Sequence, residues 1–205
     1  MAVKNLIFDL GGVILDLDVP KTIGEFARVS GLAPGEVAQR FRDSDGFLKY
    51  ERGEISDKEF RDFVRDLYAV SITDDELDAC WNAMLGGIPA SKLDLLQTLR
   101  KKYQVFLLSN TNTIHLNYIN STILPPSKSV PSLESYFDRA YYSHVMGKRK
   151  PEREIFEQVL DENNLDAEES LFLDDNAENV EGAKLVGLQT AFVNTPDFIL
   201  TYFNE

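Results

Sequence analysis

The sequence predicts an α/β fold: a doubly wound parallel sheet with a Rossmann-like core, and a small all-helical cap inserted after the first strand. Three observations predict it. Short apolar runs alternate with amphipathic helical patterns over most of the chain, as in parallel sheets with covered faces. Helical patterns alone occupy the stretch from residue 17 to 88. Polar residues directly follow several apolar runs, as they do at the carboxyl edge of such sheets.

Five apolar segments are predicted to be buried strands: residues 3–9, 103–108, 139–142, 170–174 and 188–193. Helical patterns lie between most of them. One has apolar residues at positions 155, 156, 159 and 160, and another begins at Val180 and ends at Gly187 as at a C-cap. Strands that alternate with helices pair in parallel, so we expect helices on both faces of one sheet.

The stretch before the second predicted strand shows helical patterns and no strand pattern. Its first helix is expected to end at Gly31. Two later helices begin with capping boxes, Ser56 with Glu59 and Thr73 with Glu76. We therefore expect an α/β core with an all-helical insertion between its first two strands. The predicted bounds are 1–16 with 89–205 for the core and 17–88 for the cap.

The segment from Lys4 to Ile14 is the most informative of the chain. Its apolar run ends on Asp9, and Gly11 and Gly12 follow at once. This pattern delivers a carboxylate to the edge of a sheet and then turns the backbone, and open α/β proteins carry out chemistry at that edge. Taken alone, an aspartate at a strand end more often only caps the following loop, so other segments must decide.

Two further segments offer groups that can hold an anion. The second strand ends on Ser109 and Asn110, whose hydroxyl and backbone N–H groups suit an anion, although both residue types also cap helices. Lys150 precedes Pro151 and Glu152, which suit the first turn of a helix. A lysine fixed there can meet an anion, although adjacent Lys and Arg residues more commonly form a solvated cluster.

The fourth strand ends on two adjacent carboxylates, Asp174 and Asp175. Like charges this close repel each other, and without a cation one of the two tends to stay protonated. A hard, oxygen-seeking ion such as Mg²⁺ removes that conflict. The alternative is a loop with an aspartate cap.

In chain order, the motifs run Asp, Ser, Lys and Asp-Asp, and this order resembles the haloacid dehalogenase-like hydrolase superfamily. The resemblance covers essentially the whole chain. Its members are mostly Mg²⁺-dependent phosphatases. The opening Phe-Asp-Leu-Gly and the strand ends Leu-Ser-Asn-Thr-Asn and Asp-Asp-Asn-Ala-Glu-Asn-Val-Glu-Gly-Ala are similar to the bacterial α-D-glucose-1-phosphate phosphatases and their relatives.

The resemblance implies that Asp9 is the nucleophile, which takes the phosphoryl group as an aspartyl-phosphate that water then hydrolyses. It implies a Mg²⁺ site formed by Asp9, the main-chain carbonyl of Gly11 and Asp175, with Asp174 at one remove. It also implies that three groups hold the phosphoryl oxygens: the hydroxyl of Ser109, the N–H of Asn110 and the ammonium of Lys150.

The resemblance also implies that the helical insertion is a cap that closes over the site and selects substrates. In this cap, the hydrophilic loop Tyr50 to Gly53 is a candidate substrate contact. Arg52 on this loop is placed to reach a substrate hydroxyl or phosphate, and a solvated turn residue is an equal alternative. The expected function is therefore a Mg²⁺-dependent phosphatase of small phosphomonoesters.

One position departs from the family pattern. Most phosphatases of this superfamily have a second aspartate, a general acid and base, where this chain has Gly11. Three interpretations remain open. The substrate has a good leaving group, as an anomeric sugar phosphate does; another group such as Asp16 or Asp18 donates the proton; or only phosphate or partner binding persists. A metal-independent dehalogenase-type hydrolase is a further alternative, which the pair Asp174 and Asp175 disfavours.

Composition limits the partners. The chain has 21 Lys and Arg against 34 Asp and Glu, a net charge of −13, which argues against nonspecific binding to nucleic acid or to anionic membranes. We expect a small phosphorylated metabolite as the partner. The single cysteine, Cys80, excludes an intrachain disulfide, and no apolar signal segment precedes the first strand, so we expect a cytoplasmic location. The oligomeric state stays open.

Three smaller features complete the expectations. Cys80 lies beside Trp81 in an apolar helical pattern, so we expect a core residue and not a nucleophile. His115 and His144 have no cysteine or histidine partner nearby, and we expect ordinary surface or helix residues, not metal ligands. Three prolines between residues 125 and 131 predict an exposed loop without assigned function.

Overall fold

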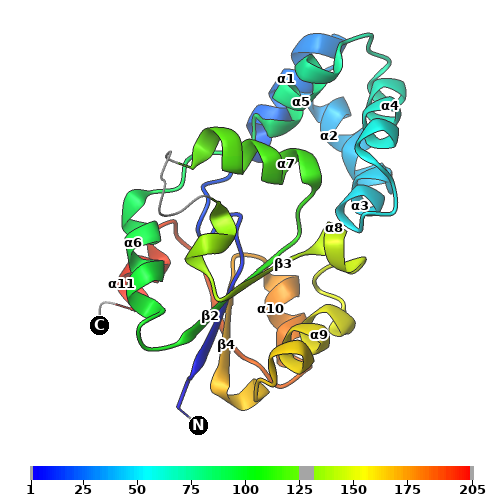
Figure 1. Cartoon of the computed structure of the whole chain (residues 1–205). Coiled ribbons are helices and arrows are strands. Elements are labelled where there is room, and N and C mark those ends of the chain that lie inside the picture. Colours follow the sequence, from blue (N-terminus) through cyan, green and yellow to red (C-terminus); the bar gives the residue numbers. More distant parts are fainter. Residues whose placement is uncertain (1, 125–131, 204–205) are drawn as a thin grey trace.

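The computed structural model describes residues 2–124 and 132–203, and the proline-rich loop predicted at 125–131 lies outside them. Its centre is one parallel sheet of five strands in the order β3-β2-β1-β4-β5 (Figure 1). The strands are β1 (Asn5–Phe8), β2 (Gln104–Ser109), β3 (Arg139–Tyr142), β4 (Ser170–Asp174) and β5 (Gln189–Phe192). All five fall on predicted segments, and the predicted doubly wound fold is confirmed.

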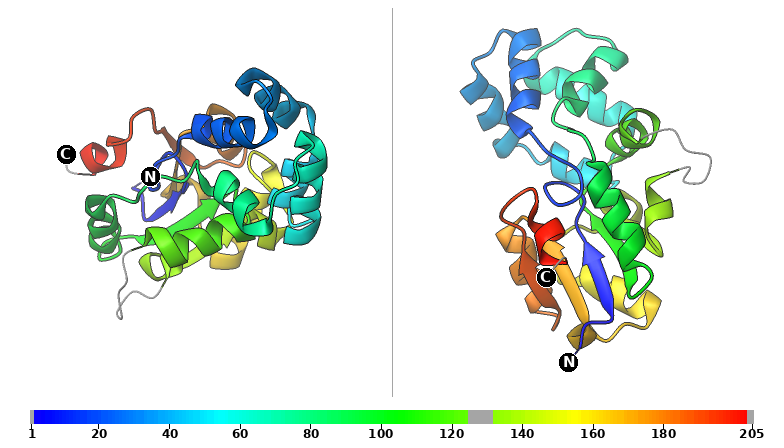
Figure 2. Two further views of the ribbon diagram at one scale, coloured as in Figure 1. Left: turned by 90° about the horizontal axis from the view of Figure 1, so that it is seen from above. Right: turned by 90° about the vertical axis from the view of Figure 1, so that its left-hand side faces the viewer.

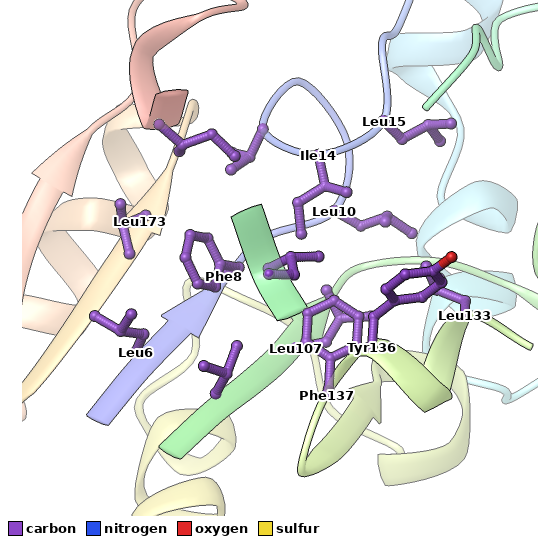
Figure 3. Close-up of a cluster of buried hydrophobic side chains, with 14 of the residues drawn as sticks. Leu6, Phe8, Leu10, Ile14, Leu15, Leu107, Leu133, Tyr136, Phe137 and Leu173 are labelled. Atoms are coloured by element: carbon purple, nitrogen blue, oxygen red, sulfur yellow. The ribbon is translucent and has the colours of Figure 1, made fainter. Parts of the chain in front are cut away.

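Helices cover both faces of the sheet. Side chains of β1 alternate between the two faces, and every residue of β1 is therefore buried. Leu6 and Phe8 face α6 (Ala90–Leu99) and α11 (Phe198–Tyr202). Ile7 faces α9 (Arg153–Asn163) and α10 (Ala177–Lys184) on the opposite side (Figure 1). Figure 3 shows the first of these clusters, in which Phe8, Leu107 and Leu173 come from three neighbouring strands.

Five helices lie between β1 and α6, and together we call them the cap: α1 (Val19–Ser30), α2 (Pro34–Asp43), α3 (Gly46–Glu51), α4 (Asp57–Tyr68) and α5 (Asp74–Asn82). These helices lie together at one end of the molecule, beyond the edge of the sheet (Figure 2). They share an apolar core around Phe60 and Trp81, whose ring centroids are 5.2 Å apart. Ile114 of α7 (Thr113–Tyr118), which follows β2, also packs into this core.

Local sequence signals set the ends of the cap helices. Gly31 ends α1 in the left-handed conformation at φ 73°, as predicted. Both predicted capping boxes form, with the Ser56 hydroxyl accepting the N–H of Glu59 and the Thr73 hydroxyl accepting that of Glu76. Cys80 is buried in the cap core, where burial raises the pKa of its thiol, so its predicted core role is confirmed.

Two antiparallel linkers join the cap to the sheet. Gly86 donates its N–H to the Asp16 carbonyl at 2.7 Å, and Asp18 donates to the Met84 carbonyl at 2.8 Å. The N–H of Asp16 in turn reaches the Gly87 carbonyl at 3.0 Å. The two crossings are therefore bonded to each other and form one narrow connection.

The remaining short elements are α8 (Ser143–Met146), a π-helical turn (Ile119–Ile123) and two 3₁₀ turns (Leu133–Tyr136 and Ala167–Glu169). Among the described residues, no helix is both long enough and apolar enough to cross a bilayer.

The cap core predicts a large effect of Phe60→Ala on stability. Phe60 is fully buried and stacks on Tyr50 with ring centroids 4.0 Å apart. Its truncation should lower the free energy of unfolding by about 3–5 kcal/mol, measured by denaturant titration. Phe192→Ala is the control, because that ring is 48% exposed, and it should cost about 0.5 kcal/mol or less. Equal losses in both variants would contradict the role of Phe60.

Candidate active site

Parallel pairing brings the polar strand ends to one edge of the sheet. Phe8 of β1 is level with Leu107 of β2 and Leu173 of β4. The next residue of β1, Asp9, therefore lies beside the ends of both neighbouring strands, and its N–H donates to the Leu173 carbonyl at 2.9 Å. This arrangement gathers the predicted residues Asp9, Ser109 and Asp174, all three buried.

The ammonium group of Lys150 lies between two of these carboxylates. Its Nζ is 2.6 Å from Asp9 Oδ1 and 2.7 Å from Asp174 Oδ2. A third bond, of 2.8 Å, goes to the Leu108 carbonyl. Only 1% of the lysine is exposed, so its three N–H donors are matched by three acceptors out of contact with water.

Asn110 fixes the backbone of Lys150 from both sides. Its Nδ2 donates to the Lys150 carbonyl at 2.9 Å, and its Oδ1 accepts the Lys150 N–H at 2.9 Å. Sequence reasoning assigns Asn110 a phosphate-binding N–H and misses this clamp, which joins residues 40 positions apart. The prediction that Pro151 lies in the first turn of a helix is wrong, because α9 begins only at Arg153 and Lys150 sits in a separate turn before it.

The two adjacent aspartates have different surroundings. Asp174 is fully buried, and it accepts bonds from Lys150, from the N–H of Asn176 and from the side chain of Asn179. Asp175 lies at the exposed rim, and its carboxylate accepts a hydrogen bond from its own backbone N–H. Its Oδ2 would lie 2.0 Å from a Cβ at Gly12, a residue at φ +73°, so only glycine permits this approach.

The charges of this cluster fit a divalent cation. Oxygens of Asp9, Asp174 and Asp175 lie within 4.8 Å of one another. Burial raises the pKa of Asp9 to about 7, Lys150 opposes this rise and Asp174 adds to it. Partial desolvation and the charge of Asp174 also raise the pKa of Asp175. A hard cation such as Mg²⁺ stabilises the ionised form of such a carboxylate cluster.

The same physics keeps Lys150 charged. Burial alone would lower the pKa of its ammonium group, but the carboxylates of Asp174 and Asp9 outweigh burial and raise that pKa. The site therefore combines a fixed positive charge with the carboxylates that suit a metal ion.

A pocket of about 250 Å³ lies over this edge, between the sheet and the cap. Its floor includes Gly11, Ser109 and Asn110, and its roof includes Glu51 and Trp81. Ser109 is a buried residue on this floor, where its hydroxyl can meet a ligand.

His115 also lines this pocket, and of the two predicted alternatives, surface or helix residue, it is a helix residue. It lies in α7 but is buried, with its ring stacked on Trp81 at 4.7 Å between centroids. Burial lowers the pKa of His115 to about 4, so the imidazole is neutral at physiological pH. His144 is half-buried on α8.

Leu17 fills the space beside Gly11. A Cβ added at Gly11 would come within 2.5 Å of Leu17 Cδ1. Leu17 lines both the pocket over Ser109 and a larger outer pocket of about 470 Å³ beside Asp175. Of the two candidate acids on this linker, Asp16 pairs with Lys92 and also lines the outer pocket beside Asp175, whereas Asp18 pairs with Lys21.

Arg52 does not line either pocket, and its guanidinium pairs with Glu152 of the core. The position of Arg52 therefore does not support the predicted contact with substrate. Its neighbour Glu51 faces the pocket instead and pairs with Arg149 at 3.1 Å. No local sequence pattern indicates either pairing, because each joins residues about 100 positions apart.

Comparison with known proteins identifies relatives over nearly the full length. A family model described as haloacid dehalogenase-like hydrolase matches residues 3–187. The D-ribitol-5-phosphate phosphatase of Bacteroides thetaiotaomicron is 33% identical over 189 residues, which cover 92% of this chain and 90% of the relative.

Solved structures agree. A haloacid dehalogenase family enzyme from Bacteroides thetaiotaomicron, in complex with magnesium and inorganic phosphate, is 38% identical with a TM-score of 0.85 over 93% of this chain and 94% of that one. A haloacid dehalogenase-like hydrolase from Porphyromonas gingivalis is 31% identical, with a TM-score of 0.89 over 100% of this chain and 98% of that one. On the family model, the relatives and the shared fold, this chain belongs to the haloacid dehalogenase-like hydrolases.

Proposed function

We propose that this protein is a Mg²⁺-dependent phosphatase that hydrolyses small sugar-type phosphomonoesters through an aspartyl-phosphate on Asp9. One observation carries the proposal: Lys150 bridges Asp9 and Asp174 at the carboxyl edge of the sheet, and Asp175 lies within reach of both carboxylates. The phosphatase class and the cofactor Mg²⁺, both predicted from the sequence, are confirmed at family level by the named relatives. The sugar-type substrate and the cytoplasmic location stay predictions.

In the proposed reaction, an Asp9 carboxylate oxygen attacks phosphorus while the bond from phosphorus to the ester oxygen breaks. The leaving alkoxide takes a proton, and an aspartyl-phosphate remains on Asp9. Water then attacks phosphorus, releases inorganic phosphate and restores the carboxylate. The overall reaction consumes one water and releases one alcohol.

The surrounding groups stabilise the charge on the transferring phosphoryl group. The ammonium of Lys150, the hydroxyl of Ser109 and the N–H of Asn110 are the proposed donors to its oxygens. Asp9, Asp175 and the carbonyl of Gly11 are the proposed Mg²⁺ ligands, and the ion supplies further positive charge to the phosphoryl group. Because its oxygens already bind Lys150 and Asn179, we assign Asp174 to the positioning of Lys150 and to metal binding at one remove.

We further propose that residues 17–88 act as the cap that selects substrates over a core of residues 1–16 and 89–205. The roof residues Glu51 and Trp81 come from this cap, so the group attached to the phosphate meets them. A small phosphorylated metabolite fits a pocket of about 250 Å³. The acidic cluster disfavours a metal-independent dehalogenase.

The first prediction tests the function itself. Purified protein should hydrolyse an activated aryl phosphate with Mg²⁺, and EDTA should stop the reaction because the carboxylate cluster then has no cation. Asp9→Asn should abolish turnover while circular dichroism shows an intact fold. Full activity without divalent metal would instead support the dehalogenase-type alternative. Phosphate binding without any hydrolysis would support a non-catalytic binding module.

The second prediction separates the two adjacent aspartates. Asp175→Ala should weaken Mg²⁺ binding by more than roughly tenfold in calorimetric titration, with little change in melting temperature. Asp174→Ala should mainly destabilise the fold, by about 3–5 kcal/mol, because a buried ion pair loses one partner. Gly12→Ala should act like Asp175→Ala, and Gly24→Ala, whose new Cβ meets nothing within 4 Å, is its control. Wild-type Mg²⁺ affinity in Asp175→Ala would shift the metal assignment to Asp174.

The third prediction concerns the missing acid at Gly11. If no residue replaces it, an alkoxide leaves unprotonated, and the rate depends steeply on the pKa of the leaving group. Aryl and anomeric phosphates should react at least about a hundredfold faster than primary alkyl phosphates in single-turnover kinetics. The series should include D-ribitol 5-phosphate as a primary alkyl ester, because one relative is named a D-ribitol-5-phosphate phosphatase. A flat rate across the series, with chemistry rate-limiting, would show that another group donates the proton.

A further inference from the structure

Two ion pairs join the cap to the turn that carries Lys150. Arg149, just before the lysine, binds Glu51 of the cap through Nε and a terminal nitrogen, both at 3.1 Å. Glu152, two residues after the lysine, pairs with Arg52 of the cap. Adjacent cap residues thus bind the two ends of one four-residue turn, Arg149 to Glu152.

Glu152 also shapes this turn from within. Its Oε2 accepts the N–H of Arg149 at 3.3 Å, and its own N–H donates to the Arg149 carbonyl at 3.0 Å. Its other oxygen, Oε1, binds Arg52. The carboxylate of Glu152 therefore links the cap directly to the backbone turn that presents Lys150.

The ion pairs lie in a close backbone contact. Gly53, at φ +67°, comes so near to α8 that an added Cβ would lie 2.2 Å from the His144 carbonyl oxygen. All four paired side chains are half-buried, between 23% and 34% exposed. Partial shielding from water strengthens such pairs relative to freely solvated ones.

We propose that the Arg52–Glu152 and Glu51–Arg149 pairs form a latch through which cap docking positions Lys150. The pairs persist only while the cap is docked, because one member of each belongs to the cap. When the cap opens, the turn loses both ion pairs with the cap. The Lys150 ammonium is then held only by its bonds to Asp9, Asp174 and the Leu108 carbonyl. Arg149 and Glu152 are positioning residues in this scheme, and the inference rests on the proposed phosphoryl-binding role of Lys150.

The Arg52–Glu152 pair gives the sharper test, because neither side chain lines the pocket over Ser109. Arg52→Glu and Glu152→Arg each place like charges opposite one another, and the double swap Arg52→Glu/Glu152→Arg restores attraction. The matched control is Arg100→Glu, which makes the same charge change beside Asp138. The Arg100–Asp138 pair has similar exposure, 34% and 38%, and joins two core segments.

The measurements are kcat and KM for a Mg²⁺-supported aryl phosphate without hydroxyl groups, the melting temperature, and calorimetric binding of inorganic phosphate. Each single latch variant should lose on the order of tenfold in kcat/KM and bind phosphate more weakly, with melting temperatures close to that of Arg100→Glu. The double swap should recover part of the loss, because it restores the attraction to the cap but not the acceptor that Glu152 offers to the Arg149 N–H, and Arg100→Glu should match wild type.

Wild-type kinetics in both single variants, or no recovery in the double swap, would overturn the latch. A loss confined to a sugar phosphate, with the aryl phosphate unaffected, would also overturn it and make Arg52 a substrate contact. If wild-type protein hydrolyses nothing, the proposed function fails first; the phosphate-binding measurement still tests the latch, since the same loss and recovery are expected there.

Discussion

The buried ammonium of Lys150 between Asp9 and Asp174 is the interaction on which the site depends. A charge removed from water costs several kcal/mol unless it is paired and hydrogen-bonded. The three bonds of Lys150 meet that requirement only if β1, β2 and β4 end at the same level, because one acceptor comes from each strand end. The parallel register of the sheet is thus needed to stabilise this buried charge. It also sets the positions of the side chains in the candidate site.

The local charge count explains how an acidic protein can accept a phosphate. With all groups ionised, Asp9, Asp174 and Asp175 contribute −3 and Lys150 contributes +1, a local balance of −2. A divalent cation brings this balance to zero, so the site reaches neutrality only with its ion present. The chain carries a net charge of −13, so a dianionic substrate is repelled unless the ion and Lys150 offset the negative charge of the site.

Much of this arrangement follows from local sequence. The central strands β1, β2 and β4 are buried apolar runs and were predictable, and the polar residues at their ends, Asp9, Ser109 and Asp174, mark the candidate site. The capping boxes at Ser56 and Thr73 are likewise local patterns. Contacts across the chain were not predictable in this way. The clamp of Asn110 on Lys150, the pairing of Arg52 with Glu152 and the burial of His115 all depend on segments that meet only in the folded protein.

The narrow connection between cap and sheet has a consequence for the evolution of such proteins. Because the two linkers enter side by side and bond to each other, an inserted domain can be exchanged by recombination without altering the strands of the sheet. Contacts between core and cap constrain such an exchange, however, because Ile114 of the core lies in the cap's apolar cluster and His115 stacks on the cap's Trp81. A foreign insert must therefore bring a surface that matches α7 and the turn from Arg149 to Glu152, so these contacts limit which inserts the sheet can accept.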